Sequence, residues 1–518
     1  MAYSVQLFGD ERESVMAMMT RNMVLATGAL ALAIASPALT QTTATSRTAN
    51  VQPFSQAEKD QGAQAHTQIM AEFGDAYAGS QANYVRSVGQ AIAVQSGLSS
   101  ARTDFTVTLL NSPVNNAFAL PGGYIYCTRQ LMALMNNEAE LAGVLGHEVG
   151  HTAARHSRAR QRRATRNSIL GVLATVLGGA IGDNGGILGG LGGLLQNNAM
   201  QAAQAATLGF SRAQETQADD LGIRYLSGAG YDPMALSTVL ASLAAQTSLD
   251  VRVTGQDARA IPAWASTHPE PAARVQRALA QARAANVTNG RTNRDGFLTA
   301  LNGVLYADDP HQGVVEGQNF LHPDLRLGFT VPQGFGIQNG TSAVGISGNS
   351  GQAQFTTGPY SGDMNAYIRQ AFQAVIGQNQ QGAVLGDIQR TTVNGIPAAY
   401  ASSRVTTRQG QIELTIFAYE FAPDRAYHFA TVAQAGQTRL FDPMFASVRR
   451  LSGSEAAAIR PRRLSVVTVR RGDTIASLSG RMAYPAFQQE RFLVLNALNA
   501  SSTISPGQRV KIVTYATN

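Results

Sequence analysis

Two histidines four residues apart, with a glutamate directly after the first, are the residues of this sequence best suited to chemistry. His147 and His151 fall in a segment whose apolar residues recur with helical spacing, so both imidazoles leave one helix face about one turn apart. Two neutral ring nitrogens placed in this way can bind a zinc ion. Glu148 lies about 100° around the helix from His147, where it can act as general base on a water without ligating the metal. The pattern predicts a hydrolytic site with one Zn²⁺ per chain.

A zinc site of this kind needs a third protein ligand. Ala154 and Ser157 stand where an extended motif would continue with glycine and a further histidine, so the third ligand must come from elsewhere. A second amphipathic helix is predicted from residue 211 to residue 228, and its Glu215 can complete a set of two histidines and one glutamate. Asp219, one turn further on the same face, can accept the N–H of a ligating histidine and fix its tautomer.

The helix that carries the two histidines needs a defined start and strands to pack against. Asn137 is expected to cap this helix, with Glu140 three residues later completing a capping pattern. Residues 105–110 alternate like a strand. Residues 116–120 and 124–126 flank a Pro-Gly-Gly turn and predict two strands joined by that turn.

The composition excludes several other kinds of site. The 518 residues include one cysteine, Cys127, which excludes an intramolecular disulfide framework and any multi-cysteine metal site. Cys127 is expected to be an inert, small hydrophobic residue. The net charge of +7 comes almost entirely from arginines, because Lys59 and Lys511 are the only lysines. These arginines cluster locally, so we expect anionic envelope surfaces and no nucleic acid among the partners.

His147-Glu-x-x-His151 together with Glu215-x-x-Ala218-Asp219 resembles the zinc peptidases of the CAAX prenyl protease and heat-shock membrane protease type. Within them the chain resembles the soluble periplasmic branch, which includes the β-barrel assembly-enhancing protease. The resemblance covers about half of the chain, with a peptidase domain expected at residues 50–290. Further matching segments are Asn116-Ala-Phe-Ala-Leu-Pro-Gly-Gly123, Glu140-Leu-Ala-x-Val-Leu145, Arg155-His156 and Ser266-Thr-His-Pro269 with Arg274.

The resemblance implies roles for residues that spacing alone leaves open. It implies that Asn116, Ala117, Phe118 and Ala119 form an edge strand along which an extended substrate lies, in agreement with main-chain recognition by strand addition. A buried hairpin is the equally weighted alternative for this segment. It also implies that His268 approaches the open metal position and holds the enzyme latent, in a regulatory or transition-state role. Arg274, one or two turns later, is suited to bind a carboxylate or an oxyanion.

Two apolar segments raise the question of contact with membranes. Residues 1–40 predict a secretory signal peptide, because a basic residue precedes a short apolar run that is followed by small residues. This run is shorter than the about 20 residues that span a bilayer. Residues 168–195 are rich in glycine and aliphatic residues and are also interrupted too early to span. They predict a mobile lid or a segment that contacts the membrane surface, with a buried helical hairpin as the alternative. The arginines at residues 155–166 offer charge for anionic lipid or form a solvated helix face.

Two further domains are expected after the peptidase. Residues 310–450 are rich in Thr, Val, Phe and Tyr with many glycine turns and predict an α+β domain of unknown role, including a strand at 321–332 and an amphipathic helix at 363–378. Residues 460–463 predict a linker. Residues 464–516 resemble the LysM module, read as strand, helix, helix and strand with a Gly-Asp-Thr turn capping the first helix. The resemblance implies binding to peptidoglycan, and a purely structural role is the alternative.

The sequence as a whole predicts a multidomain chain. A mainly α-helical zincin domain of the gluzincin type with a small β-sheet comes first, then an α+β domain, then a small βααβ LysM-like domain. The predicted function is that of a periplasmic zinc metalloendopeptidase, associated with membrane or wall, whose substrates are unfolded or misassembled envelope proteins. A chaperone or a peptidoglycan-tethered scaffold with a latent protease site is the alternative.

Overall fold

The computed structural model describes residues 51–73, 75–156, 210–254, 268, 271–348, 350–376, 383–407 and 410–516. The predicted signal peptide at residues 1–40 and the glycine-rich segment at residues 168–195 lie outside these residues. The described residues all belong to one unit, Asn50–Asn518. No helix among them is both long and apolar enough to cross a bilayer.

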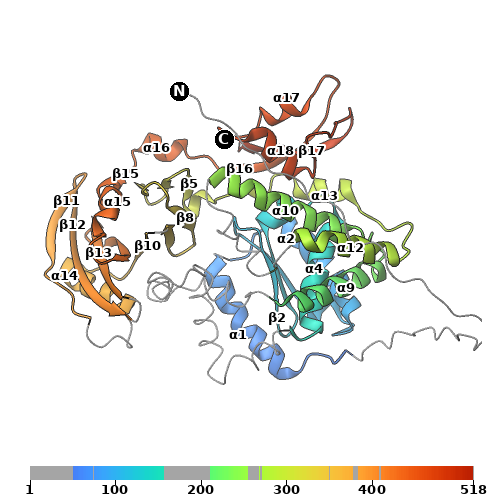
Figure 1. Ribbon diagram of the computed structural model, residues 1–518, viewed down its shortest axis with the longest axis horizontal. Coiled ribbons are helices and arrows are strands. Elements are labelled where there is room, and N and C mark those ends of the chain that lie inside the picture. The colour runs from blue at the N-terminus through green and yellow to red at the C-terminus, as the bar shows by residue number, and fades with distance from the viewer. Residues whose placement is uncertain are drawn as a thin grey trace, which may run out of the picture. The chain divides into compact units, whose positions relative to one another are not determined.

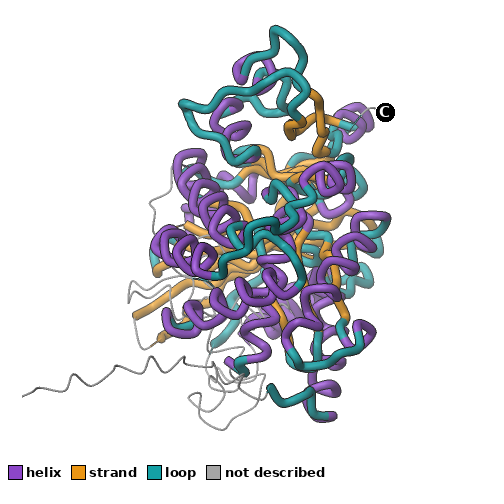
Figure 2. The backbone as a smooth tube through the Cα atoms, turned by 90° about the vertical axis from the view of Figure 1, so that its right-hand side faces the viewer, coloured by secondary structure: helices purple, strands orange, loops and turns teal. Residues whose placement is uncertain are grey.

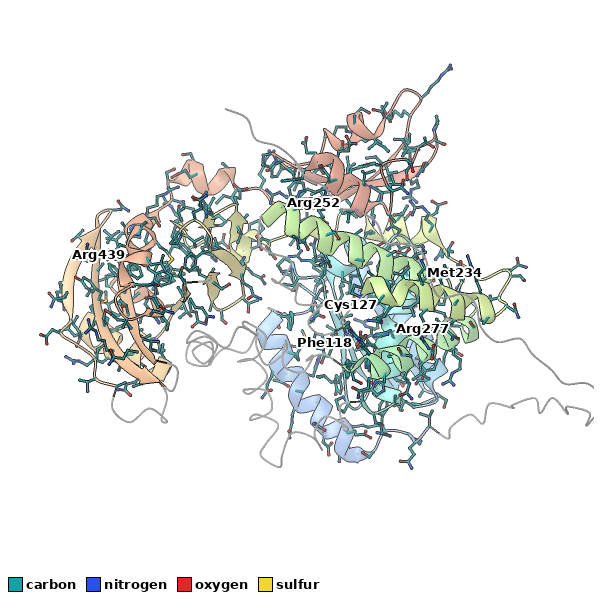
Figure 3. All side chains as sticks on the ribbon, in the orientation of Figure 1. Phe118, Cys127, Met234, Arg252, Arg277 and Arg439 are labelled. Atoms are coloured by element: carbon teal, nitrogen blue, oxygen red, sulfur yellow. The ribbon has the colours of Figure 1, made fainter. Side chains whose placement is uncertain are left out.

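The N-terminal part contains a small mixed sheet of three strands, β1 (Thr106–Leu110), β2 (Ala117–Leu120) and β3 (Tyr124–Thr128). The strand order is β1-β3-β2, with β3 parallel to β1 and antiparallel to β2. This confirms the two strands expected around the Pro-Gly-Gly turn. Gly122 has φ +82°, and a Cβ there would come within 2.5 Å of the Glu58 carbonyl oxygen, so the turn requires glycine. Phe118 and Cys127 lie on the neighbouring strands β2 and β3 and are labelled in Figure 3.

Helices make up most of the rest of this part of the chain, and helices dominate the view in Figure 2. They are α1 (Gln56–Phe73), α2 (Ser80–Ala93), α3 (Arg129–Leu134), α4 (Glu138–Ala153), α9 (Arg212–Gly228), α10 (Ala235–Thr254), α12 (Pro271–Ala284) and α13 (Arg294–Leu301). The helix α4 is the centre of the arrangement, since every residue from Glu138 to His151 is buried. Its partners include α2, α9, α10 and β2. As predicted, α4 begins at Asn137, whose side chain accepts a hydrogen bond from the Glu140 backbone N–H at 3.0 Å.

Residues 310–450 form a layered α+β structure. Seven strands make one antiparallel sheet in the order β11-β12-β13-β14-β10-β9-β8, and four make a second in the order β15-β7-β6-β5. Alternate residues of β13 (Gly410–Ala422) pack in two apolar clusters, one with α14 (Met364–Ile376) and one with the second sheet. The seven-stranded sheet therefore lies between α14 and the four-stranded sheet. The remaining strands are β5 (Val314–Glu316), β6 (Asn319–His322), β7 (Leu327–Thr330), β8 (Gly336–Asn339), β9 (Val344–Gly348), β10 (Gly351–Thr357), β11 (Gln389–Val393), β12 (Ile396–Thr407), β14 (Arg425–Gln434) and β15 (Arg449–Arg450).

One strand expected in this domain is wrong and one helix is confirmed. The expected strand at 321–332 is divided between β6 and β7, which pair antiparallel as a hairpin. The chain reverses after His322, where Pro323 and Asp324 favour a turn and Arg326 adopts φ +50°. The expected helix at 363–378 is α14, which begins and ends within two residues of the prediction.

The C-terminal residues fold as strand, helix, helix and strand: β16 (Arg462–Thr468), α17 (Ile475–Ser479), α18 (Gln488–Leu495) and β17 (Arg509–Tyr515). The two strands are antiparallel, and β4 (Leu305–Tyr306) adds a third strand beside β16. Thr474 caps α17 as predicted, since its hydroxyl accepts from the Ser477 N–H at 3.0 Å. The linker expected at 460–463 is wrong, because Arg462 and Arg463 pair with β4 and β17 as part of a strand.

Candidate metal centre

The two helices that carry the predicted ligands approach closely because glycines line their contact. A Cβ on Gly222 of α9 would lie 3.2 Å from the His147 backbone nitrogen, and one on Gly150 of α4 would lie 3.1 Å from the Ala218 carbonyl oxygen. A larger residue at either position would push the helices apart. The close packing places Glu215, in the first turn of α9, against both histidines of α4.

Four buried side chains converge at this contact. His147, His151, Glu215 and His268 each offer one ligand atom, and these atoms all lie within 4.8 Å of one another. The Nε2 atoms of His147 and His151 are 3.0 Å apart. Glu215 carboxylate oxygens lie 3.6 Å from the His147 Nε2 and 3.4 Å from the His151 Nε2. The structure thus brings together the three predicted metal ligands and the residue predicted to regulate them.

The far nitrogens of both α4 histidines are held by other side chains. The His147 Nδ1 lies 3.0 Å from a carboxylate oxygen of Asp219, as the sequence predicts. This contact places the proton on Nδ1 and leaves Nε2 free to bind a metal. The His151 Nδ1 lies 2.9 Å from the His156 Nδ1, whose other ring nitrogen is 3.1 Å from the Gln217 Oε1.

Two of the residues around the histidines were not assigned roles from the sequence. His156 orients His151 from just beyond the end of α4, and the Phe210 ring stacks on the His151 ring with 3.6 Å between centroids. Their signals were weak: His156 stood in the sequence only as part of a matching Arg-His pair, and Phe210 precedes α9 without any motif. Contacts of this kind depend on how the chain folds back and leave no periodic pattern.

Arg274 of α12 connects the two acidic residues of α9. Its guanidinium donates to both Asp219 carboxylate oxygens, at 2.9 and 2.5 Å, and lies 2.5 Å from the Glu215 Oε2. All three side chains are buried. The predicted carboxylate partner of Arg274 is therefore intramolecular, and the second Glu215 oxygen, Oε1, faces His151.

Glu148 and His268 face each other across the site. The His268 Nε2 lies 3.4 Å from the Glu148 Oε1, and its Nδ1 lies 3.1 and 3.2 Å from the two Glu215 oxygens. His268 also approaches His147, with 3.3 Å between Nδ1 and Nε2. His268 therefore stands between the predicted catalytic glutamate and the predicted metal ligands.

Burial and charge act on the two glutamates in opposite directions. Burial raises the pKa of Glu148, and the contributions of His268 and His147 do not cancel this effect. Burial also acts to raise the pKa of Glu215, but His268, His147 and Arg274 outweigh it and hold that pKa below its usual value. The geometry thus pairs an ionised ligand carboxylate with a neighbour that takes up a proton readily.

Burial and neighbouring charges also set the pKa values of His151, Asp219 and His268. Burial lowers the pKa of His151 well below its usual value, which keeps the imidazole neutral as metal binding requires. Burial acts to raise the pKa of Asp219, but hydrogen bonds from Arg274 and His147 outweigh it and hold the carboxyl ionised. Burial acts to lower the pKa of His268, and the two glutamates outweigh it and raise that pKa.

A cavity with a mostly apolar lining opens beside these residues, and the free space in it and at its open mouth together is about 440 Å³. His147, Glu148, His268 and Arg274 form its polar side. The other lining residues are Asn116, Ala117, Leu131, Val144, Leu236, Val239, Leu240 and Leu243. The cavity therefore joins the start of the predicted substrate strand to the predicted catalytic glutamate through an aliphatic surface.

The predicted substrate strand has features of both an edge strand open to substrate and a buried hairpin. The strand β2 is an edge of its sheet within the described residues, yet Ala117 and Phe118 are buried and Ala119 is half-buried. Phe118 stacks on Tyr126 of β3. Asn116 is buried where it meets the cavity, and its side-chain oxygen has no hydrogen-bond partner among the described residues.

This region of the chain is similar to known proteins. Residues 79–282 match the model of Peptidase family M48. The Beta-barrel assembly-enhancing protease of Yersinia pestis is 33% identical over 247 residues, which are 47% of this chain and 46% of that protein. The Mitochondrial metalloendopeptidase OMA1 of Schizosaccharomyces pombe is 31% identical over 223 residues, 42% of this chain and 59% of that protein.

A third relative matches a similar share of this chain. The Beta-barrel assembly-enhancing protease of Escherichia coli is 28% identical over 218 residues, 42% of each chain. The chain thus spans about half the length of the curated relatives that it matches. Among solved structures, a Bacteroides thetaiotaomicron protein covers 39% of this chain at 10% identity with a TM-score of 0.23, which is too low for an argument about fold.

Proposed function

We propose, from the Peptidase family M48 domain at residues 79–282, that this protein is a zinc metalloendopeptidase. One observation carries the proposal: the ring nitrogens of His147 and His151 and the carboxylate of Glu215 converge in a buried site, with Glu148 beside them at the mouth of a cavity. The metallopeptidase names of relatives aligned to this region support the same assignment.

The donor set fits Zn²⁺. Two imidazole nitrogens and one carboxylate oxygen are the ligands of many catalytic zinc sites, whereas Ca²⁺ and Mg²⁺ favour oxygen donors. Burial favours neutral His151, and Asp219 fixes the tautomer of His147. Because Arg274 holds the Glu215 Oε2, the Oε1 atom is the oxygen we assign to the metal.

Hydrolysis then depends on how this chain holds protons and substrate. When bound, Zn²⁺ supplies Lewis-acid chemistry, polarising a peptide carbonyl and making a water more acidic. We assign Glu148 as the general base that takes the proton of the attacking water and passes it to the leaving amine. Burial raises the pKa of Glu148, which improves its ability to hold that proton between the two steps.

We assign His268 a regulatory role at the same site. Its Nδ1 is within 3.3 Å of the His147 Nε2 and of both Glu215 oxygens, so it is placed to act as a fourth ligand. In that arrangement His268 would exclude water and keep the site latent. Movement of His268 would open the position and leave the other residues in place.

Substrate recognition is assigned to the edge of β2 and to the cavity. An extended peptide added along β2 would be held by main-chain hydrogen bonds, which demand no particular sequence. The Asn116 side-chain oxygen, unpaired within the described residues, can accept one further N–H. The aliphatic lining of the cavity favours an apolar side chain next to the cleaved bond. Unfolded chains offer both features, and folded proteins hide them.

The setting in which the enzyme works is also proposed. Relatives named for β-barrel assembly support an envelope location, and the expected signal peptide supports a periplasmic one. We therefore propose misfolded or misassembled envelope proteins as substrates. The LysM-like C-terminal module is proposed to bind peptidoglycan, with peripheral membrane contact through residues 168–195.

The test is to measure bound zinc and the cleavage of casein, an unfolded substrate, by the same preparation. We expect one zinc per chain and activity that a chelator removes and added zinc restores. Glu148→Gln should lower turnover about 10²- to 10⁴-fold while zinc stays bound, because only the base is lost. Full activity in the metal-free protein, or in Glu148→Gln, would contradict the mechanism. A chaperone effect that survives in an inactive wild-type protein would favour a latent scaffold instead.

A further inference from the structure

The C-terminal βααβ module contains one fully buried lysine, although its surface is rich in exposed arginines. Lys511 of β17 has an exposed fraction of 0%, and it is one of only two lysines in the chain. Asn496, at the end of α18, holds the Lys511 backbone from both sides, accepting from its N–H at 2.7 Å and donating to its carbonyl at 2.9 Å. The side chain therefore leaves its own module in a fixed direction.

The Lys511 ammonium ends on the N-terminal part of the chain, at the end of α3. It donates to the carbonyl oxygens of Ala133, Leu134 and Met135 at 2.8, 3.2 and 2.6 Å. The last carbonyls of a helix lack partners within the helix and favour a positive charge. Three acceptors match the three N–H groups of an ammonium, whereas a neutral amine has only two. Burial lowers the pKa of Lys511, and the nearby Glu140 acts against this effect.

The next backbone groups along the chain, between α3 and α4, are hydrogen-bonded by residues beyond 282, where the family match ends. Arg294 of α13 donates to the Asn136 carbonyl at 2.8 Å and to the Arg509 carbonyl of β17 at 3.0 Å. The Thr292 carbonyl accepts from the backbone N–H groups of Glu138 and Ala139, the first residues of α4, at 3.0 and 3.3 Å. Both ends of the short connection between α3 and α4 are therefore held by residues beyond 282.

The apolar core is continuous across the same boundary. Residues of the C-terminal module belong to one buried cluster with residues of α2, α4 and α10, and the elements β16, α18 and β17 lie beside α10 and α13 in Figure 1. The module contributes Leu464, Val469, Leu478, Met482, Phe492, Leu495, Val510, Ile512 and Val513 to that cluster. A module tethered by a flexible linker would have its own separate core.

We propose that Lys511 is a positioning residue for the metal helix α4, and that the C-terminal module is a structural part of the peptidase. The cation fixes the end of α3. Glu140, whose carboxylate accepts from the Asn136 N–H at 2.7 Å, and Arg294 tie that end to the start of α4. The helix α4 presents His147 and Glu148 to the site. This goes beyond the proposed function, which it uses only to name α4 as the metal helix. Any ligand of the module would then be held rigidly beside the active site.

The first test uses the two lysines of the full-length chain as their own control. Lys59 on α1 is 42% exposed in its side chain, and Lys511 is fully buried. Under reductive methylation followed by peptide mass spectrometry, we expect Lys511 to react at least 100-fold more slowly than Lys59 in the native protein, and equally fast in denaturant. Equal rates in the native protein would refute the proposal, because the module would then be detached.

The second test asks whether the charge itself matters, through amide hydrogen exchange of three full-length variants. Lys511→Met should speed exchange at residues 129–145 at least tenfold and leave β13 and β14 unchanged, whereas Lys59→Met should change neither. Lys511→Arg should restore most of the protection, because it keeps a cation and several donors. If packing alone mattered, Lys511→Met would preserve more of this protection than Lys511→Arg, because arginine is bulkier. That order of protection would overturn the assignment. Neither test depends on the protein's own peptidase activity or on bound zinc, so a failure of the proposed function would leave both results interpretable.

Discussion

Arg274 offers the sharpest test of how the candidate site is stabilised. Its guanidinium binds both oxygens of Asp219 and one oxygen of Glu215, and the exposed fractions of the three side chains are 10%, 1% and 1%. In Arg274→Gln, two buried carboxylates lose their cation in the metal-free protein. Removing one partner of a buried ion pair costs about 3–5 kcal/mol, because the other charge stays buried without compensation.

The same helix supplies a matched control. Arg277, labelled in Figure 3, lies one turn further along α12 and pairs with Asp220, the neighbour of Asp219, at 2.7 Å. This pair is 34% and 43% exposed in its side chains. Exposed pairs contribute about 0.2–1 kcal/mol. Arg277→Gln therefore makes the same chemical change on the same two helices, at an exposed pair with one carboxylate.

The assay is urea denaturation of the metal-free protein, followed by fluorescence of the only tryptophan, Trp264, which belongs to the M48 span. We expect Arg274→Gln to lower the free energy of unfolding by about 3–5 kcal/mol and Arg277→Gln by less than about 1 kcal/mol. Adding Asp219→Asn to Arg274→Gln should recover part of the loss, because one uncompensated charge is removed. Equal losses for the two single variants would refute the reasoning from burial.

Three further predictions concern other parts of the molecule. His156→Ala should lower zinc affinity about 10- to 100-fold in chelator competition, because His156 orients His151, and unchanged affinity would remove that role. Leu243→Ala should widen the cavity and raise the ratio of kcat/KM for peptides with Phe over Leu beside the cleaved bond by about tenfold; an unchanged ratio would separate the cavity from recognition. Burial lowers the pKa of His428 to about 4, so the unfolded chain binds the proton more readily, and stability present above about pH 6.5 is lost as the pH falls toward 4. His428→Gln should therefore reduce the loss of unfolding free energy between pH 7 and pH 4.5 by about 2.5 kcal/mol, and an identical pH dependence in both proteins would contradict the effect of burial.

The parts of the site that sequence could predict are those fixed by local geometry. His147, Glu148 and His151 follow from helical spacing, and Asn137 and Thr474 follow from capping chemistry that acts over three residues. Glu215 could be proposed only because a two-histidine set needs a third ligand. Its distance of 64 positions from His151 carries no periodic signal.

The features that sequence could not predict are contacts between distant segments. Nothing near Arg274 indicates that its partners are Asp219 and Glu215, and nothing near His156 indicates that its ring meets His151. The two errors have different origins. The strand expected at 321–332 ignored a turn signal within an apolar run, and the linker expected at 460–463 was read from Arg and Pro alone. That strand depends on a pairing that forms only in the folded chain, between Arg462 and Tyr306 of β4, which are 156 positions apart in sequence.

The position of Lys511 shows why a family match and a stable domain need not have the same limits. The match ends at residue 282, and Lys511, the cation that donates to the carbonyls at the end of α3, lies beyond it. In this chain Lys511, Arg294 and the Thr292 carbonyl complete the connection into α4. Orphan carbonyls buried at a helix end must find donors. A relative without a C-terminal module must therefore supply a donor from another segment or leave this helix end in contact with water.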